Sequence, residues 1–221
     1  MSESDESLFR EVDEEVRQEQ YKKLWKLYGN YFTAAAVAVV LFVAGFKGWQ
    51  YWQLSQSEKA ARVYAEAVTK LEQGKTADAD AAFAAIDHSG YARLGDLRRA
   101  ASLASQGKTD EAVALYDALA NDQKSDKSLR DLARVRAGYV LVDKLPPADL
   151  ISRLGAFDNE ESPWRGLARE IFALAAYRTG DYTMADRYLN SIIADQGVAL
   201  ELRQRAQTLL EVITPLLSAK K

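Results

Sequence analysis

The sequence predicts an all-α protein: a single N-terminal transmembrane helix, then an α-solenoid of about four helical hairpins, then a C-terminal capping helix. Three observations predict this class. An apolar run of twenty residues without a charge extends from Leu27 to Phe46. Behind this run the apolar residues recur at helical spacing. A pattern of glycine, alanine and larger apolar residues also repeats along the chain.

Composition narrows the possible functions. The chain has 221 residues, of which 48% are hydrophobic and 28% are charged, so it is long enough to bury a core. Residues 53–221 carry twenty-four acids and twenty-three bases. Because a nucleic-acid binder needs a clustered basic face, nucleic acid is not an expected partner. The chain has no cysteine, which excludes disulfides and thiol chemistry.

Residues 1–26 form the first predicted element, an amphipathic segment. They carry eight acids and five bases, with bases concentrated late, as suits a helix dipole. Two interpretations stay open: a short solvated helix that leads into the membrane, or a docking helix for a cytosolic partner. The apolar residues that recur at three- and four-residue steps are Leu8, Phe9, Val12, Val16, Tyr21, Leu24, Trp25 and Tyr28.

Residues 27–52 form the second predicted element, a transmembrane signal anchor with an aromatic flank. Twenty residues at a rise of about 1.5 Å make a helix of roughly 30 Å, which matches the hydrocarbon core of a bilayer. The alternative is a buried helix of a soluble core, but such a helix rarely runs for twenty residues without a charge. The residues expected at the two membrane interfaces are Trp25, Lys26, Lys47, Trp49, Tyr51 and Trp52.

A cleaved signal peptide is the competing interpretation of the apolar run. It fails because the charged stretch before the run is long and largely acidic, and because bulky rings follow where a cleavage site needs small residues. Lysine and arginine set the orientation of a span, and they are slightly more frequent before the run than after it. This bias predicts a cytoplasmic N-terminal segment, residues 1–26, and an external C-terminal domain, residues 53–221.

Three segments beyond residue 52 align with one another. Each has a glycine, an alanine five residues later, and larger apolar residues nine and twelve residues later. The second and third glycines are two periods apart, so we expect a degenerate unit in which Asp143 replaces the glycine and Ala148 replaces the alanine. The period is typical of tetratricopeptide-type hairpins. The aligned residues are Gly74, Ala79, Phe83 and Ile86; Gly107, Ala112, Tyr116 and Leu119; and Gly180, Ala185, Leu189 and Ile192.

Each part of this repeat has a physical role. A glycine in the left-handed conformation ends the first helix of a hairpin, and small alanines let the paired helices approach closely. A single hairpin cannot bury its apolar face alone, so the units must stack. We expect the first helices, which end at Gly74, Gly107 and Gly180, to line a concave surface for another protein. The final segment, Ala199 to Leu217, should form a closing helix that Pro215 interrupts.

The catalytic motifs in the chain are all weak. The triplet GKT begins at Gly74 and again at Gly107, but a phosphate-binding loop needs a further glycine five residues earlier, where Thr69 and Ser102 stand. His88 is the only histidine, and no metal-ligand or catalytic spacing surrounds it. The sequence therefore predicts no enzyme, no cofactor, no metal and no small-molecule substrate.

The residues after the anchor resemble a known family. The motif GWQYW at Gly48 to Trp52, followed by SEKAARVYAEAV, is similar to the opening of ancillary SecYEG translocon subunits. The apolar stripe that begins at Tyr91 is similar too, as is Trp164 placed sixteen residues before Gly180. The similarity extends from the end of the apolar run to the carboxyl end, whereas the N-terminal tail is longer and more acidic here.

The resemblance implies a bacterial inner-membrane protein with its N-terminus in the cytoplasm and a periplasmic repeat domain. Members of this family associate with the SecYEG translocon and link it to periplasmic chaperones, so these are the expected protein partners. One alternative is a periplasmic scaffold that coordinates cell division or envelope assembly. An enzyme is the other class left open, and the lack of a complete catalytic motif in the sequence disfavours it.

Overall fold

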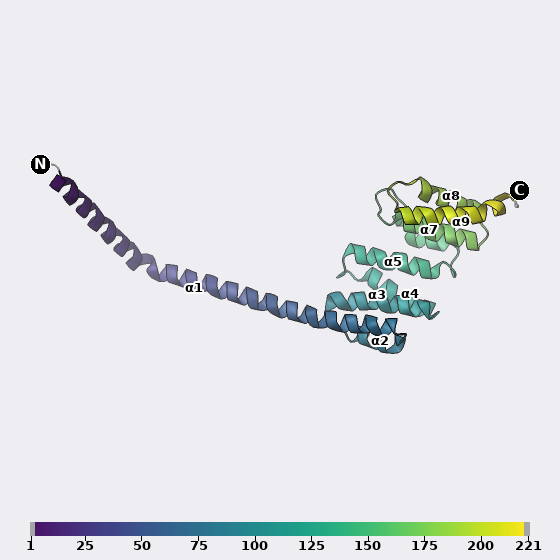
Figure 1. The fold of residues 1–221 in the computed structure, drawn as a ribbon, viewed down its shortest axis with the longest axis horizontal. Coiled ribbons are helices and arrows are strands. Elements are labelled where there is room, and N and C mark those ends of the chain that lie inside the picture. Colours follow the sequence, from purple (N-terminus) through teal and green to yellow (C-terminus); the bar gives the residue numbers. More distant parts are fainter. Residues whose placement is uncertain (1–2, 219–221) are drawn as a thin grey trace. The chain divides into compact units, whose positions relative to one another are not determined.

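The computed structural model describes the backbone of residues 3–218, together with the side chains of Arg17 and of residues 21–217. Every regular element in this part of the chain is helical, which confirms the all-α prediction. The chain divides into two compact units, Met1–Glu58 and Lys59–Lys221. The elements, shown in Figure 1, are α1 (Glu3–Glu72), α2 (Thr76–Ala84), α3 (Ser89–Ser105), α4 (Thr109–Asn121), α5 (Lys127–Leu141), α6 (Pro147–Leu154), the short 3₁₀ helix η1 (Gly155–Phe157), α7 (Arg165–Arg178), α8 (Tyr182–Ala194) and α9 (Leu200–Ser218).

The first unit consists of α1 up to Glu58. Between Leu27 and Phe46 every residue except Gly29 is exposed. Only 6% of the apolar window is buried, whereas the core helix of a soluble protein is mostly buried. Among the described residues, this helix is the one that is long and apolar enough to cross a membrane. Because a helix pairs its backbone groups internally, it can do so without exposing them to lipid.

In the second unit, the described part of the chain forms four helical hairpins closed by α9. The end of α1 pairs with α2, α3 with α4, α5 with α6, and α7 with α8, and Figure 1 shows α3 to α9 in successive layers. Three of the four turns contain a glycine at positive φ: Gly74 and Gly107 at 76°, and Gly180 at 75°. The second helices that follow these turns begin two residues later, at Thr76, Thr109 and Tyr182.

The small and the large apolar side chains of the repeat have different roles in packing. Ala79, Ala112 and Ala185 are fully buried, because a larger side chain here would push the paired helices apart. Four apolar clusters follow one another from α1 to α9, so each hairpin is stabilised by its neighbours. The larger residues that fill these clusters include Phe83, Tyr116, Leu119, Leu189 and Ile192 from the second helices, and Ile86 just after α2.

The third hairpin contradicts one expectation. Ala148 is exposed, so Asp143 and Ala148 do not hold the positions of the turn glycine and the packed alanine. The equivalent position is Leu145, because α6 begins two residues after it, at Pro147. Proline is well suited to the first turn of a helix, since its missing N–H would be unpaired there in any case. The buried residues five, nine and twelve positions after Leu145 are Leu150, Leu154 and Phe157.

The last helix contradicts a second expectation, because Pro215 does not interrupt it. α9 continues through Pro215 and ends at Ser218. Proline removes one main-chain hydrogen bond, but Ile213 is fully buried beside it and Leu216 is half-buried. Packing of the last turns against the unit therefore outweighs the lost hydrogen bond.

Candidate protein-binding groove

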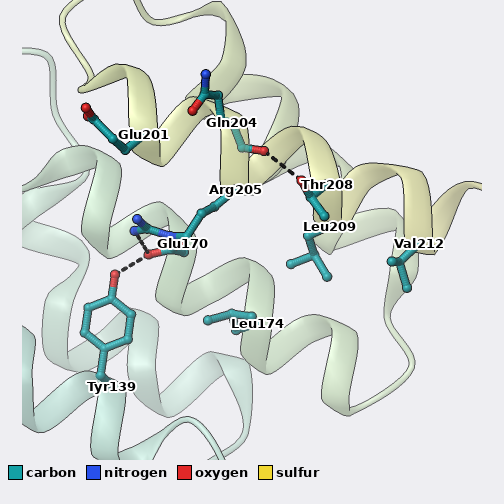
Figure 2. A pocket seen from close by; sticks show the side chains of 9 residues that line it. All are labelled: Tyr139, Glu170, Leu174, Glu201, Gln204, Arg205, Thr208, Leu209 and Val212. Carbon is teal, nitrogen blue, oxygen red and sulfur yellow. Dashed lines mark hydrogen bonds and ion pairs between the residues drawn. The ribbon is translucent and has the colours of Figure 1, made fainter.

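An open groove of about 830 Å³ lies on the surface of the second unit. Its floor comes from α7, and its walls come from α5 and α9, which both contact α7. Since α5 and α7 are first helices of their hairpins, the groove lies on the side of the stack that the first helices form. Figure 2 shows the side chains that line it, which are Tyr139, Glu170, Leu174, Glu201, Gln204, Arg205, Thr208, Leu209 and Val212.

α9 supplies most of the lining as a single stripe. Glu201, Arg205, Thr208 and Val212 recur at three- and four-residue steps, which places them on one face of the helix. Ala206, on another face of α9, is 1% exposed and packs in the core of the unit. Burial of that face holds the stripe toward the groove.

One end of the groove is apolar. Leu174 of α7 lies there with Leu209 and Val212 of α9, as Figure 2 shows. Val212 is 49% exposed, although it is a large aliphatic residue. Exposed aliphatic side chains beside polar ones are typical of surfaces that bind another protein.

The other end of the groove is built around Glu170, which is only 7% exposed. Arg205 donates from Nε and Nη2 to the two carboxylate oxygens of Glu170, at 2.9 and 3.0 Å. The Tyr139 hydroxyl donates a further hydrogen bond to the same carboxylate, and Figure 2 shows both side chains turned toward it. Because a buried carboxylate without partners would be strongly destabilising, these contacts explain how Glu170 is tolerated in this position.

Contact with Glu170 also affects the protonation of Tyr139 and Arg205. Burial, reinforced by the hydrogen bond to Glu170, raises the pKa of Tyr139 well above its usual value. The phenol therefore stays protonated and keeps donating its hydrogen bond. The hydrogen bond to Glu170 likewise raises the pKa of Arg205. Both donors are thus fixed in their protonated forms at neutral pH, which suits a structural role better than proton transfer.

The turn residues predicted from the repeats do not line this groove. Gly74, Gly107 and Gly180 occupy turns, and the three alanines that follow them lie in the core. Of the first helices expected to form the partner surface, α7, which ends before Gly180, contributes to the groove. The helices that end at Gly74 and Gly107 do not, and the walls come from α5 and α9 instead.

Sequence reasoning missed Tyr139, Glu170 and Arg205. A charged residue on an amphipathic helix usually belongs to the solvated face, so neither Glu170 nor Arg205 stands out locally. One signal was present, because Glu170 directly precedes the apolar run IFALAA, where an unpaired acid would be costly. That signal indicates a buried partner for Glu170 but does not identify it.

The residues predicted at the membrane interfaces lie on α1 in the first unit. The indole of Trp25 packs against Gly29, because a Cβ at Gly29 would lie 3.3 Å from that ring. Trp25 and Gly29 belong to an apolar hollow of about 720 Å³, which Tyr28 and Phe32 also line. The predicted interface residues, all exposed, are Trp25, Lys26, Lys47, Trp49, Tyr51 and Trp52.

In the described part of the chain, no group of three or more histidine, cysteine, aspartate or glutamate side chains is placed to hold a metal ion. His88 lies half-buried just before α3, and its ring centroid is 5.7 Å from that of Tyr91. This contact gives His88 a packing role at the start of α3.

Known proteins resemble the chain over most of its length. A family model described as a tetratricopeptide repeat-like domain matches residues 22–171. The ancillary SecYEG translocon subunit of Haemophilus influenzae is 30% identical over 182 residues, which cover 79% of this chain and 82% of that protein. The ancillary SecYEG translocon subunit of Escherichia coli K12 is 27% identical over 173 residues, which cover 76% and 82%. No solved structure matches the chain.

The family-model match covers more than half of the chain and extends from α1 into α7. It agrees with the spacing of glycines and alanines in the sequence and with the stacked hairpins of the second unit. The chain therefore belongs to the tetratricopeptide repeat-like family of ancillary SecYEG translocon subunits.

Proposed function

We propose that this chain is a non-enzymatic, membrane-anchored adaptor that binds other proteins as an ancillary component of the SecYEG translocon and links it to periplasmic chaperones. The observation that carries the proposal is the presence, in one chain, of an exposed charge-free segment of α1, Leu27 to Phe46, and of stacked hairpins with an open groove. The names of both relatives support an association with the translocon.

The proposed topology is a single pass through the bacterial inner membrane. Residues 1–26 lie in the cytoplasm, residues 27–52 form the anchor with its aromatic flank, and residues 53–221 form the periplasmic tetratricopeptide-like domain. The excess of lysine and arginine before the span supports this direction. The interface residues, which include Trp25 and Lys26 on one side and Lys47 and Trp49 on the other, would hold the helix at the two headgroup layers.

The proposed mechanism has two physical steps. Anchoring confines the repeat domain to the membrane surface, which raises its effective concentration beside a membrane complex. The groove then binds a partner through the apolar side chains Leu174, Leu209 and Val212. Neither step needs a cofactor or a chemical reaction.

The repeat-turn residues have a structural part in this mechanism. The glycines allow each hairpin to reverse direction within a few residues, and the alanines set how closely the paired helices pack. Together they determine the curvature of the stack and so the shape of the surface offered to a partner. These residues are Gly74, Ala79, Gly107, Ala112, Gly180 and Ala185.

Site-specific photo-cross-linking in intact cells tests the proposal. A photoreactive amino acid at Leu41, in the span, should cross-link to translocon subunits. One at Val212, in the groove, should cross-link to periplasmic proteins identified by mass spectrometry. Val63, an exposed valine outside the groove, is the matched control for Val212. Cross-links to cell-division or envelope-assembly proteins in place of translocon subunits would overturn the proposal and favour the scaffold alternative.

A further inference from the structure

The guanidinium of Arg205 is held in one orientation. It donates to both carboxylate oxygens of Glu170, and two-point pairing of this kind fixes the plane of a guanidinium. Glu170 is itself nearly buried and is held from α5 by the Tyr139 hydroxyl. The polar end of the groove therefore presents a preorganised set of N–H donors.

Several of these donors remain available to a ligand. A guanidinium has five N–H groups, and Glu170 accepts from two of them. If the neighbouring Tyr139 oxygen accepts from a third N–H group, two N–H groups of Arg205 still have no partner in the described part of the chain. The Arg205 side chain is 56% exposed, so these groups are open to the groove. Gln204 also lines the groove, and its side-chain amide has no hydrogen-bond partner among the described residues.

The charges of the groove favour a neutral acceptor over a carboxylate. Glu170 already neutralises Arg205, and Glu201 adds a negative charge that no described residue pairs. A ligand carboxylate would lie beside two acidic side chains, Glu170 and Glu201, and only one basic side chain, Arg205, which is electrostatically unfavourable. A peptide carbonyl can accept from Arg205 without bringing any further charge.

Backbone carbonyls are free only in certain conformations. In an α-helix they accept hydrogen bonds from the helix itself, apart from those of the last turn. An extended segment leaves its carbonyls and N–H groups unpaired, and its side chains alternate between two sides. Such a segment could pair its backbone with Arg205 and Gln204 while it places an aliphatic side chain between Leu174 and Val212.

We propose that the groove binds an extended, apolar and non-acidic segment of an unfolded polypeptide. Leu174, Leu209 and Val212 would hold one of its side chains, and Arg205 and Gln204 would hold its backbone. This inference rests on the proposed adaptor function and names the occupant of the groove. In a folded protein most backbone groups are already paired with one another, whereas a chain that has not yet folded leaves them free to pair with the groove.

Fluorescence anisotropy with the full-length protein in lipid nanodiscs tests the inference. The probe is a fluorescein-labelled peptide of about eight residues, uncharged and rich in valine and leucine so that it stays extended. One comparison peptide carries the same residues but is locked as a helix by a side-chain staple. Another has glutamates on both sides of the apolar residues. The extended neutral peptide should bind at least about tenfold more tightly than either, after subtraction of binding to empty nanodiscs.

Three variants locate the binding. Val212→Glu should weaken binding of the extended peptide by about tenfold or more, because it places an unpaired carboxylate in the apolar end. Arg205→Lys keeps a positive charge beside Glu170 but loses the planar fork, and should weaken binding by about threefold or more. Val63→Glu changes a 37% exposed valine outside the groove and should leave binding unchanged. Circular dichroism checks that each variant is folded.

Equal binding by the unmodified protein and the Val212→Glu variant would overturn the inference, and so would tighter binding of the stapled helix. The adaptor function fails by a different result, which is the absence of translocon subunits from the cross-links at Leu41. The two experiments probe different regions of the chain, so failure of one is distinguishable from failure of the other.

Discussion

Arg165 and Asp195 form a two-point ion pair that joins the start of α7 to the loop between α8 and α9. Arg165 donates from Nε to Oδ2 at 2.6 Å and from Nη2 to Oδ1 at 2.9 Å. Arg169 adds a contact to Oδ2 at 3.2 Å, and the Gly197 main-chain N–H donates to Oδ1 at 2.9 Å. Asp195 thereby orders the loop that leads into α9, the helix that forms one wall of the groove.

This pair predicts a pH dependence of stability. The hydrogen bond from Arg165 lowers the pKa of Asp195 from 3.8 to about 2. A carboxylate whose pKa is lowered by folding stabilises the protein above about pH 4, and this contribution is lost as the pH falls toward 2. We expect Asp195→Asn to lower the melting temperature at pH 7, and the difference from the unmodified protein to shrink below about pH 4. Thermal melts followed by circular dichroism measure both, and a difference independent of pH would contradict the prediction.

The turn at Gly107 predicts a backbone effect without a packing effect. Gly107 has a φ of 76°, and a Cβ there would have no atom within 4 Å. Gly107→Ala should therefore lower the free energy of unfolding by about 1–2 kcal/mol, through left-handed strain alone. Gly155, at a φ of −59°, is the matched control, because alanine fits there and should be neutral or stabilising by up to about 1 kcal/mol. Urea denaturation measures both, and equal changes would argue against backbone strain.

Close packing between α5 and α6 predicts a steric effect at Gly138. A Cβ at Gly138 would lie 2.5 Å from Cδ1 of Leu154 and 3.0 Å from Cδ1 of Ile171. Gly138→Ala should lower the free energy of unfolding by about 1–3 kcal/mol, because buried neighbours must shift. Combined with Leu154→Ala, it should cost less than the sum of the two single changes, since the truncated leucine leaves room. Strict additivity in a double-mutant cycle would show that the two side chains do not compete for space.

The hydrogen bond from Tyr139 to Glu170 predicts a loss of stability when the hydroxyl is removed. Tyr139→Phe leaves Glu170 with one donor side chain fewer and should lower the free energy of unfolding by about 1–2 kcal/mol. Tyr177 is the matched control, because its hydroxyl has no hydrogen-bond partner among the described residues. Tyr177→Phe should change stability by less than about 0.5 kcal/mol in the same urea titration. A larger effect at Tyr177 than at Tyr139 would argue against the role given to this hydrogen bond.

The proposed topology predicts the behaviour of reporter fusions. Alkaline phosphatase, which is active only outside the cytoplasm, should be active when fused after Lys221. The same enzyme fused after Lys26, before the span, should be inactive and serves as the matched control. A fusion after Lys221 that is stable but inactive would contradict the proposed orientation and the periplasmic role that depends on it.

The chain shows which features of a repeat protein can be predicted from its sequence. Three of the four hairpins could be aligned, because a turn glycine and a packed alanine have requirements that few other residues meet. The third hairpin could not, since Leu145 replaces the glycine and Leu150 replaces the alanine. Its register follows from packing against α5, whereas the spacing of the other repeats predicted Asp143 and Ala148 at these positions.

The candidate groove was less predictable than the fold. That the first helices would offer a surface to another protein follows from the architecture, and α7 takes part in it. The pairing of Glu170 with Tyr139 and Arg205 does not follow, because the three residues stand on different helices, 31 and 35 positions apart. Which side chains meet across helices depends on the crossing angle and register of the helices, and a local sequence pattern determines neither.

The sequence by itself determined the charge-free helix from Leu27 to Phe46 and the turns at Gly74, Gly107 and Gly180. Those features depend on short-range requirements: the thickness of a bilayer, the helical period and the need for positive φ at a tight turn. Only the tertiary structure decided the register of the third hairpin, the continuation of α9 through Pro215, and the groove around Glu170. Each of these results from packing between segments distant in sequence, where burial outweighs what a local pattern favours.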